Sequence, residues 1–147
     1  MQTYVHAKQG GIADCPAGTF YYHPVEHTLV PLTLGVELHP TVHEPFTNRP
    51  IFEQASFSLF FVNQPRAIEP IYGDLAWRFS VLEAGAMAQA IETAAPRFGI
   101  GVCPIGMLDF AAVRPLLHLE ADQELLHAHV GGLAAPADDA DWEEGVV

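Results

Sequence analysis

Basic residues are scarce in this sequence. Its 147 residues include only 6 lysines and arginines against 18 aspartates and glutamates, which gives a net charge of −12. No basic residue follows Arg114, and only Lys8 precedes Arg49. Binding to nucleic-acid phosphates or to an anionic membrane surface requires clustered cations. The charge balance therefore argues against nucleic acid and membrane as partners.

Cysteine is nearly absent, and long apolar runs are missing. Cys15 and Cys103 lie far apart, so they form neither a disulfide framework nor a CxxC motif. The first residues lack the basic and apolar regions of a signal peptide. Charged residues such as Glu83 and Glu92 interrupt the longest helix-like stretch, so no segment is typical of a membrane span. We therefore expect a cytoplasmic protein.

Apolar residues are plentiful by contrast. Hydrophobic residues make up 50% of the chain and include 9 Phe, 4 Tyr and 2 Trp, enough for the core of one ordinary domain. Acidic residues crowd the last ten positions, a composition typical of a solvated tail. We expect residues 1–133 to form one folded unit and residues 134–147 to be a disordered acidic tail.

The order of strand and helix signals predicts an α+β fold with roughly five strands and two or three helices. Residues 19–23 and 27–32 indicate a β-hairpin, and Pro31 favours a sheet edge because proline cannot donate to the ladder. The continuous apolar run 56–62 suits a central strand buried on both faces. The remaining predictions are strands at 2–8 and 123–130, a short buried strand at 99–104, and a long irregular segment at 34–52.

A long helix is expected from about residue 74 to 95. Asp74 suits the N-cap position, and Pro96 ends the helix. The centre, residues 84–88, has unusually small side chains, which allow another backbone to approach closely. This pattern favours a buried helix or a helix–helix interface. A shorter helix is expected over about residues 110–117.

Two motifs follow each other in the second half of the chain. Residues 79–89 read FSVLEAGAMAQ, and residues 98–106 read FGIGVCPIG. By itself, the second motif predicts a buried strand that leads into a tight structural turn, where a glycine also lets a flat ligand approach the backbone. Together the motifs resemble the C-terminal half of nitroreductase-superfamily flavin enzymes, especially the azoline oxidase domains of nonribosomal peptide synthetases. The resemblance extends over about residues 2–133.

The resemblance implies a nitroreductase-like α+β sandwich, of which the chain forms the C-terminal half, with FMN bound at a dimer interface that contains the long helix. It places Pro104, Ile105 and Gly106 against the isoalloxazine ring, with the Gly106 N–H directed at flavin N5. The implied reaction is the FMN-dependent oxidation of a thiazoline or oxazoline ring to a thiazole or oxazole. The implied substrate is a heterocyclic peptide bound to a carrier protein.

Two parts of the family pattern have no counterpart in this sequence. Family members carry an N-terminal segment with arginine and serine that holds the FMN phosphate, and often a basic residue near the C-terminus. Residues 115–147 contain neither Lys nor Arg, and a phosphate without cationic partners binds weakly. The resemblance thus implies a homo- or heterodimer in which a partner chain supplies the N-terminal half. The alternatives are a non-catalytic remnant or assembly module of a synthetase and, more distantly, an NAD(P)H-dependent nitro- or quinone-reductase subunit.

The catalytic base is not evident from the sequence. Azoline oxidases can use Lys and Tyr side chains, but the chain has no Lys–Tyr pair. The candidates are Tyr21, Tyr22 and His23. Alternation along a strand puts Tyr21 and His23 on one face and Tyr22 on the other. The alternative is that these side chains pack in the core.

Histidines form two loose groups. His127 and His129 alternate on the last predicted strand and so share a face, but two ligands are too few for a closed zinc site. His39, His43 and Glu44 form a second group in the long irregular segment. Because neither group has a complete ligand set in the sequence, we expect no metal site.

Overall fold

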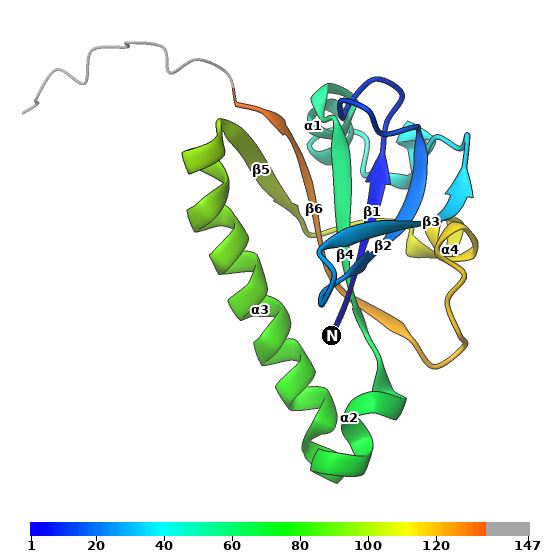
Figure 1. Cartoon of the computed structure of the whole chain (residues 1–147), viewed down its shortest axis with the longest axis vertical. Helices are drawn as coiled ribbons and strands as arrows, with labels where there is room; N and C mark the ends of the chain where they lie inside the picture. Colours follow the sequence, from blue (N-terminus) through cyan, green and yellow to red (C-terminus); the bar gives the residue numbers. More distant parts are fainter. Residues whose placement is uncertain (135–147) are drawn as a thin grey trace, which may run out of the picture.

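Six strands form one antiparallel sheet in the computed structural model, which describes residues 1–134 (Figure 1). The sheet therefore has one strand more than the roughly five expected. Its spatial order is β3-β2-β1-β4-β6-β5, so β3 and β5 are the two edges. The strands are β1 (Gln2–Ala7), β2 (Gly18–His23), β3 (Thr28–Leu34), β4 (Phe57–Asn63), β5 (Ile100–Ile105) and β6 (Glu124–Leu133).

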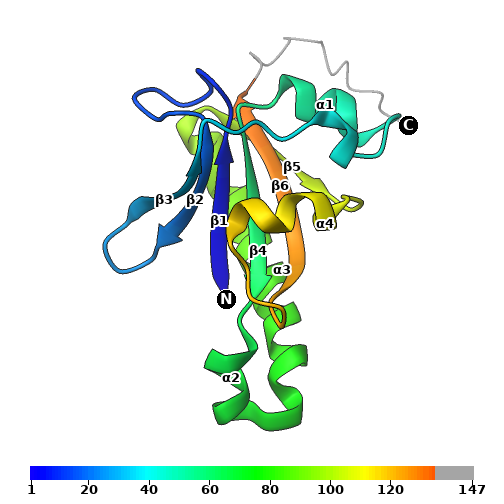
Figure 2. The same cartoon turned by 90° about the vertical axis from the view of Figure 1, so that its right-hand side faces the viewer.

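Helices cover both faces of this sheet. The long helix α3 (Ala76–Ala94) lies on one face, whereas α1 (Asn48–Gln54) and α4 (Phe110–Val113) lie on the other (Figure 2). Helix α2 (Pro65–Tyr72) follows β4 and leads into α3. Short 3-10 turns complete the chain at Pro40–Val42, Gly73–Leu75, Ala95–Phe98 and Arg114–Leu117.

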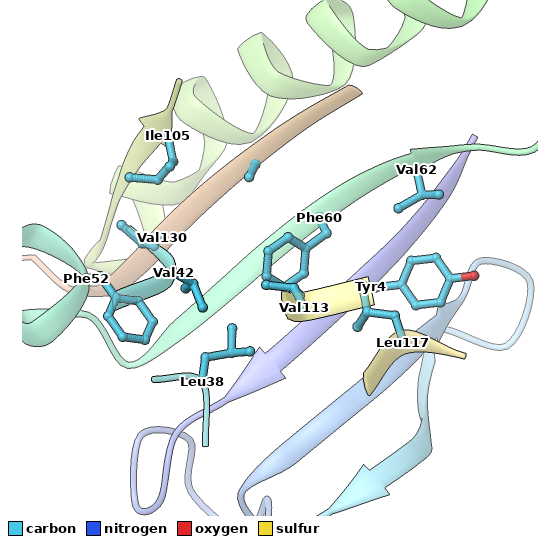
Figure 3. Close-up of a cluster of buried hydrophobic side chains, with 11 residues drawn as sticks. Tyr4, Leu38, Val42, Phe52, Phe60, Val62, Ile105, Val113, Leu117 and Val130 are labelled. Carbon is cyan, nitrogen blue, oxygen red and sulfur yellow. The ribbon is translucent and has the colours of Figure 1, made fainter. Parts of the chain in front are cut away.

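The main core lies between the sheet and the face that carries α1 and α4 (Figure 3). Phe60 of β4 and Val130 of β6 meet Phe52 from α1 and Val113 from α4 there. Phe61 points to the opposite face and is also fully buried. The prediction of a central strand buried on both faces is therefore confirmed for β4.

The predicted hairpin is confirmed as β2 and β3, which pair in antiparallel fashion. Pro31 lies on β3, which is an edge strand as predicted, and the missing backbone donor of proline is tolerated there.

The segment 34–52 is more ordered than predicted. Leu38, Val42 and Phe52 are buried in the main core, which fixes the path of the segment. The carboxylate of Glu44 accepts two backbone hydrogen bonds just before α1 begins, at 2.9 and 2.8 Å. Tertiary burial of widely spaced apolar residues orders this segment, and no local periodicity signals it.

The glycine-containing ends of β5 and β6 also differ from the prediction. β5 is half-buried, not buried, because as an edge strand it lacks a neighbour on one side. β6 does not close at Gly131 and Gly132 but continues through them, since they pair with Val102 and Gly101. The ring of Phe57 fills the space that a side chain on Gly131 would need.

The region before α3 was predicted only in part. Asp74 lies in the 3-10 turn Gly73–Leu75, so Leu75 is the N-cap residue of α3 and the predicted capping by Asp74 is wrong. Helix α2 was not predicted. It starts at Pro65, where the missing N–H costs nothing, and it contains Pro70, which obscured its helical pattern.

No helix within residues 1–134 is both long and apolar enough to cross a membrane. From residue 135 onward, the segment expected to be an acidic tail lies outside the described residues.

Candidate functional site

The predicted cofactor contact lies where β5 leaves the sheet. Ile105 is buried in the main core and pairs with Ala128, while Pro104 pairs with His129. Gly106 lies beyond these pairs and is exposed, and a Cβ atom at this position would meet no atom within 4 Å. The core therefore holds the turn in place while its open side leaves the Gly106 backbone accessible. This geometry fits a flat ring lying against the turn.

A surface hollow of about 370 Å³ adjoins this turn. The chain after Gly106 forms one wall and is tied to the opposite wall by two hydrogen bonds. Asn48 Nδ2 donates to the Met107 carbonyl at 2.9 Å, and the Asp109 N–H donates to the Val42 carbonyl at 2.8 Å. Within the described part of the chain, Arg49 is the one Lys or Arg that lines the hollow.

The loose group of His39, His43 and Glu44 does not assemble into a ligand set. His39 Nδ1 lies 2.8 Å from Thr41 Oγ1, and the Glu44 carboxylate caps the turn before α1. His43 is buried against the ring of Phe52, with 4.4 Å between ring centroids. Burial lowers the pKa of His43 to about 4, so its imidazole is neutral near pH 7.

The candidate base residues lie on β2, and the predicted alternation is observed. Tyr21 packs on Tyr4 of the main core, with 5.6 Å between ring centroids, and His23 lies at the edge of the Tyr21 ring. Tyr22 lies on the other face, where its hydroxyl is 2.6 Å from Nδ1 of His27. Tyr21 therefore packs against the main core.

β2 and β5 lie in distant parts of the sheet, because β1, β4 and β6 separate them. With about 4.8 Å between neighbouring strands, the two strands are roughly 19 Å apart. The structure does not bring Tyr21, Tyr22 or His23 together with Gly106 within one chain. A base from β2 could reach a ligand at Gly106 only across an interface.

Helix α3 packs on the sheet through its small residues. Ala76, Ser80, Ala84 and Ala88, spaced by four, are buried and face the sheet. The large apolar side chains of α3 are exposed instead, namely Trp77, Phe79, Val81 and Leu82. The small-residue signal thus reflects close packing of helix on sheet, and an apolar surface remains on the outer side of the helix.

A second group of polar side chains lies between α3 and β6. His127 and His129 share one face of β6, as predicted, with 4.6 Å between ring centroids. Glu92 reaches them from α3 and places Oε1 3.0 Å from Nε2 of the fully buried His129. The three side chains offer ligand atoms that all lie within 4.8 Å of one another. No sequence pattern links Glu92 to the histidines, because it lies on a different element, far from them along the chain.

Most basic residues with hydrogen bonds in the structure serve the fold. Arg114 donates to the carbonyls of Gln123 and Glu120, Arg66 pairs with Asp122, and Lys8 donates to the Phe52 carbonyl. Among residues 1–134, Arg49 is the one Lys or Arg around the hollow beside Gly106. The turn has an open side for a flat ring, whereas the described residues around it do not form a cationic phosphate site.

Comparison with known proteins agrees with this fold. The family model described as "Nitroreductase family" matches residues 7–132. Indigoidine synthase of Dickeya dadantii is 30% identical over 140 residues, a match that covers 93% of the chain but only 8% of the synthase. The chain therefore corresponds to a small part of that relative.

Solved structures share the same architecture. A protein assigned as a nitroreductase from Anabaena variabilis superposes with a TM-score of 0.76 at 21% identity, over 91% of this chain and 27% of that one. A second, from Ralstonia eutropha, gives 0.71 at 25% identity, over 92% and 58%. The Escherichia coli microcin synthetase McbBCD complex gives 0.77 at 15% identity, over 92% and 52%. The α+β fold expected from the sequence is confirmed, and the chain belongs to the nitroreductase family.

Proposed function

We propose that this chain is part of an FMN-dependent oxidase that converts thiazoline or oxazoline rings to thiazoles or oxazoles during natural-product biosynthesis. The observation that carries the proposal is the exposed backbone of Gly106 at the end of β5, held in place by the buried Ile105. Members of the nitroreductase family generally bind a flavin, and this turn has the open side that a flavin ring needs.

Relatives support the reaction class. Indigoidine synthase is a natural-product synthase, and the microcin synthetase complex was solved with a truncated pro-microcin bound. Both names are those of synthases, and the microcin complex is an assembly of several subunits with a peptide substrate bound. We therefore favour a carrier-bound heterocyclic substrate over a free quinone or nitro compound.

The proposed reaction requires the chain mainly to bind and orient FMN and the substrate. Oxidation of an azoline removes a hydride and a proton from the ring, and FMN, when bound, supplies the hydride acceptor and is reoxidised by oxygen. The Gly106 N–H would donate a hydrogen bond to the bound flavin and so stabilise the charge that develops on reduction. The proton acceptor comes from another chain or from the β2 residues of a second copy, since β2 is far from Gly106.

A partner chain is part of this proposal. The exposed apolar side chains of α3 offer a surface for it, and the phosphate of FMN needs cations that the residues around Gly106 do not supply. We expect the partner to bring basic residues to the phosphate and to cover the outer side of α3. The partner is either a second copy or a chain with the N-terminal half of the fold.

FMN binding tests the proposal. The purified chain is mixed with FMN, alone and with the polypeptide encoded next to it, and bound flavin is measured by absorbance and by quenching of flavin fluorescence. We expect stoichiometric flavin with the partner present, followed by oxygen-dependent conversion of azoline substrates. A soluble complex that stays colourless with excess FMN would overturn the proposal and favour an assembly module.

A substitution at the turn locates the binding site. Gly106→Val fills the open side of the turn, and it should abolish flavin binding without loss of the folded state, because no atom lies within 4 Å of the new Cβ. Ala121→Val, at another exposed turn, is the matched control and should bind FMN like the wild type. Equal flavin binding by both variants would show that the ring does not lie against Gly106.

A further inference from the structure

We infer that Glu92, His127 and His129 bind one divalent transition-metal ion of the Zn²⁺ type and that this ion fastens α3 to β6. Two imidazole nitrogens and one carboxylate oxygen form a ligand set typical of zinc sites that keep a fourth position for water. The inference concerns a site separate from the Gly106 turn, so it does not depend on the proposed flavin chemistry.

The distances are close to those of a metal site. Tetrahedral Zn²⁺ with ligand bonds near 2.1 Å holds its ligand atoms roughly 3.3 Å apart. Nε2 of His129 and Oε1 of Glu92 are already 3.0 Å apart, and the ligand atom of His127 lies within 4.8 Å of both. Rotation of the partly exposed His127 and Glu92 side chains is enough to close this gap.

The backbone holds the ligands in place. His127 and His129 lie two residues apart on β6, so their rings leave the same face of the strand, at an interplanar angle of 84°. His129 is fully buried, and its Nδ1 has no hydrogen-bond partner, so Nε2 is the nitrogen that faces Glu92. Glu92 approaches from the C-terminal half of α3, which makes the site a bridge between two elements.

The ion replaces a contact that already joins the two elements. When the ion binds Nε2 of His129, it replaces the hydrogen bond to Glu92, and the single proton of the neutral imidazole moves from Nε2 to Nδ1. The net charge of −12 adds a general attraction for cations.

A hollow adjoins the site at His127. It has a volume of about 230 Å³ and lies between α3 and β6, where His127 lines it together with Val81, Ala84, Gly85 and Leu126. A water molecule that enters from this hollow would be the fourth ligand of a four-coordinate ion. The ion has a structural role as well, since α3 faces the sheet mainly through alanines, which bury little apolar surface.

Metal binding by the whole chain, freed of metal with EDTA and without FMN, tests the inference. Titration calorimetry with ZnCl2 should give one equivalent, and Co²⁺ should produce the visible absorption of a tetrahedral site. Zn²⁺ should also raise the midpoint of thermal unfolding. Glu92→Gln and His127→Ala should each weaken Zn²⁺ binding at least about tenfold, since even the loss of an outer-shell partner costs about 10–100-fold.

His39→Ala is the matched control, because His39 is exposed and distant from β6 in the sequence. It should bind one equivalent of Zn²⁺ with wild-type affinity. Glu92 and His127 are partly exposed, so their variants should fold, which far-UV circular dichroism checks. Absence of stoichiometric binding in the wild type would overturn the inference. So would equal affinity in Glu92→Gln and His127→Ala, which indicates an adventitious ion only.

Discussion

At the scale of single residues, His43 combines deep burial with unpaired polar atoms. Its side chain is only 3% exposed, and neither ring nitrogen has a hydrogen-bond partner. Its pKa of about 4 lies below the ordinary value of 6.5, mainly through burial and then through Lys8 and Arg49. The contribution of neutral His43 to stability is therefore complete above about pH 6.5 and is lost as the pH falls toward about 4.

Replacing His43 tests this dependence of stability on pH. His43→Phe keeps the packing on Phe52 and removes the unpaired nitrogens, so the free energy of unfolding at about pH 5 should rise by about 1–3 kcal/mol. Its fall with decreasing pH should also become shallower. Urea unfolding at several pH values measures both effects. The exposed control His39→Phe should keep the wild-type slope, and a His43→Phe protein with an unchanged slope contradicts the prediction.

At the scale of secondary-structure elements, a buried hydrogen bond connects α3 to β4. Ser80 Oγ donates to Asn63 Oδ1 at 2.8 Å, and both side chains are buried. Ser80→Ala leaves the Asn63 amide oxygen unpaired, which should lower the free energy of unfolding by about 1–3 kcal/mol in urea titrations. Local helix propensity alone predicts that Ser80→Ala raises the free energy of unfolding, because alanine has a higher helix propensity than serine.

A double-mutant cycle separates these effects. The double variant Asn63→Leu with Ser80→Ala removes both polar partners, so its loss of stability should be smaller than the sum of the two single losses. Additive losses would mean that the hydrogen bond contributes nothing measurable to the attachment of α3.

At the scale of the whole molecule, the exposed apolar side chains of α3 are the surface proposed for association. Leu82 is 60% exposed, and Trp77, Phe79 and Val81 of the same helix are exposed as well. If a second copy covers the helix, the wild type should dimerise, and Leu82→Asp should place a charge in the interface and shift the chain to monomer. Light scattering coupled to size-exclusion chromatography measures the mass directly.

Val25→Asp is the control for this experiment, because Val25 is 81% exposed in the β2–β3 turn, away from α3. It should leave the dimer intact. A wild type that is monomeric at every concentration contradicts a homodimer and leaves the heterodimer with an N-terminal-half chain as the form to test. The chain covers only part of each relative named above. The mass measurement therefore bears both on the homodimer and on the heterodimer.

Several features could be predicted from local sequence alone. The apolar run of β4 and the aromatic hairpin of β2 and β3 follow from residue types and alternation along a strand. The Pro-Ile-Gly segment consists of three consecutive residues, so the end of β5 could be predicted to within one residue, although Pro104 and Ile105 still belong to the strand and only Gly106 follows it. Pro65 at the start of α2 and Pro70 inside it hid that helix, because they interrupt the apolar periodicity on which prediction relies.

Contacts between distant residues were decided only by the tertiary structure. The sheet order separates β2 from Gly106, and no local motif predicts that order. Packing of α3 buries its small residues against the sheet and leaves its large apolar residues exposed. The approach of Glu92 to His129 likewise joins two elements with unrelated local patterns. Composition and short motifs determined the family and the turn, because these depend on neighbouring residues. The arrangement of the candidate sites depends on which surfaces pack together, and only the folded chain specifies that.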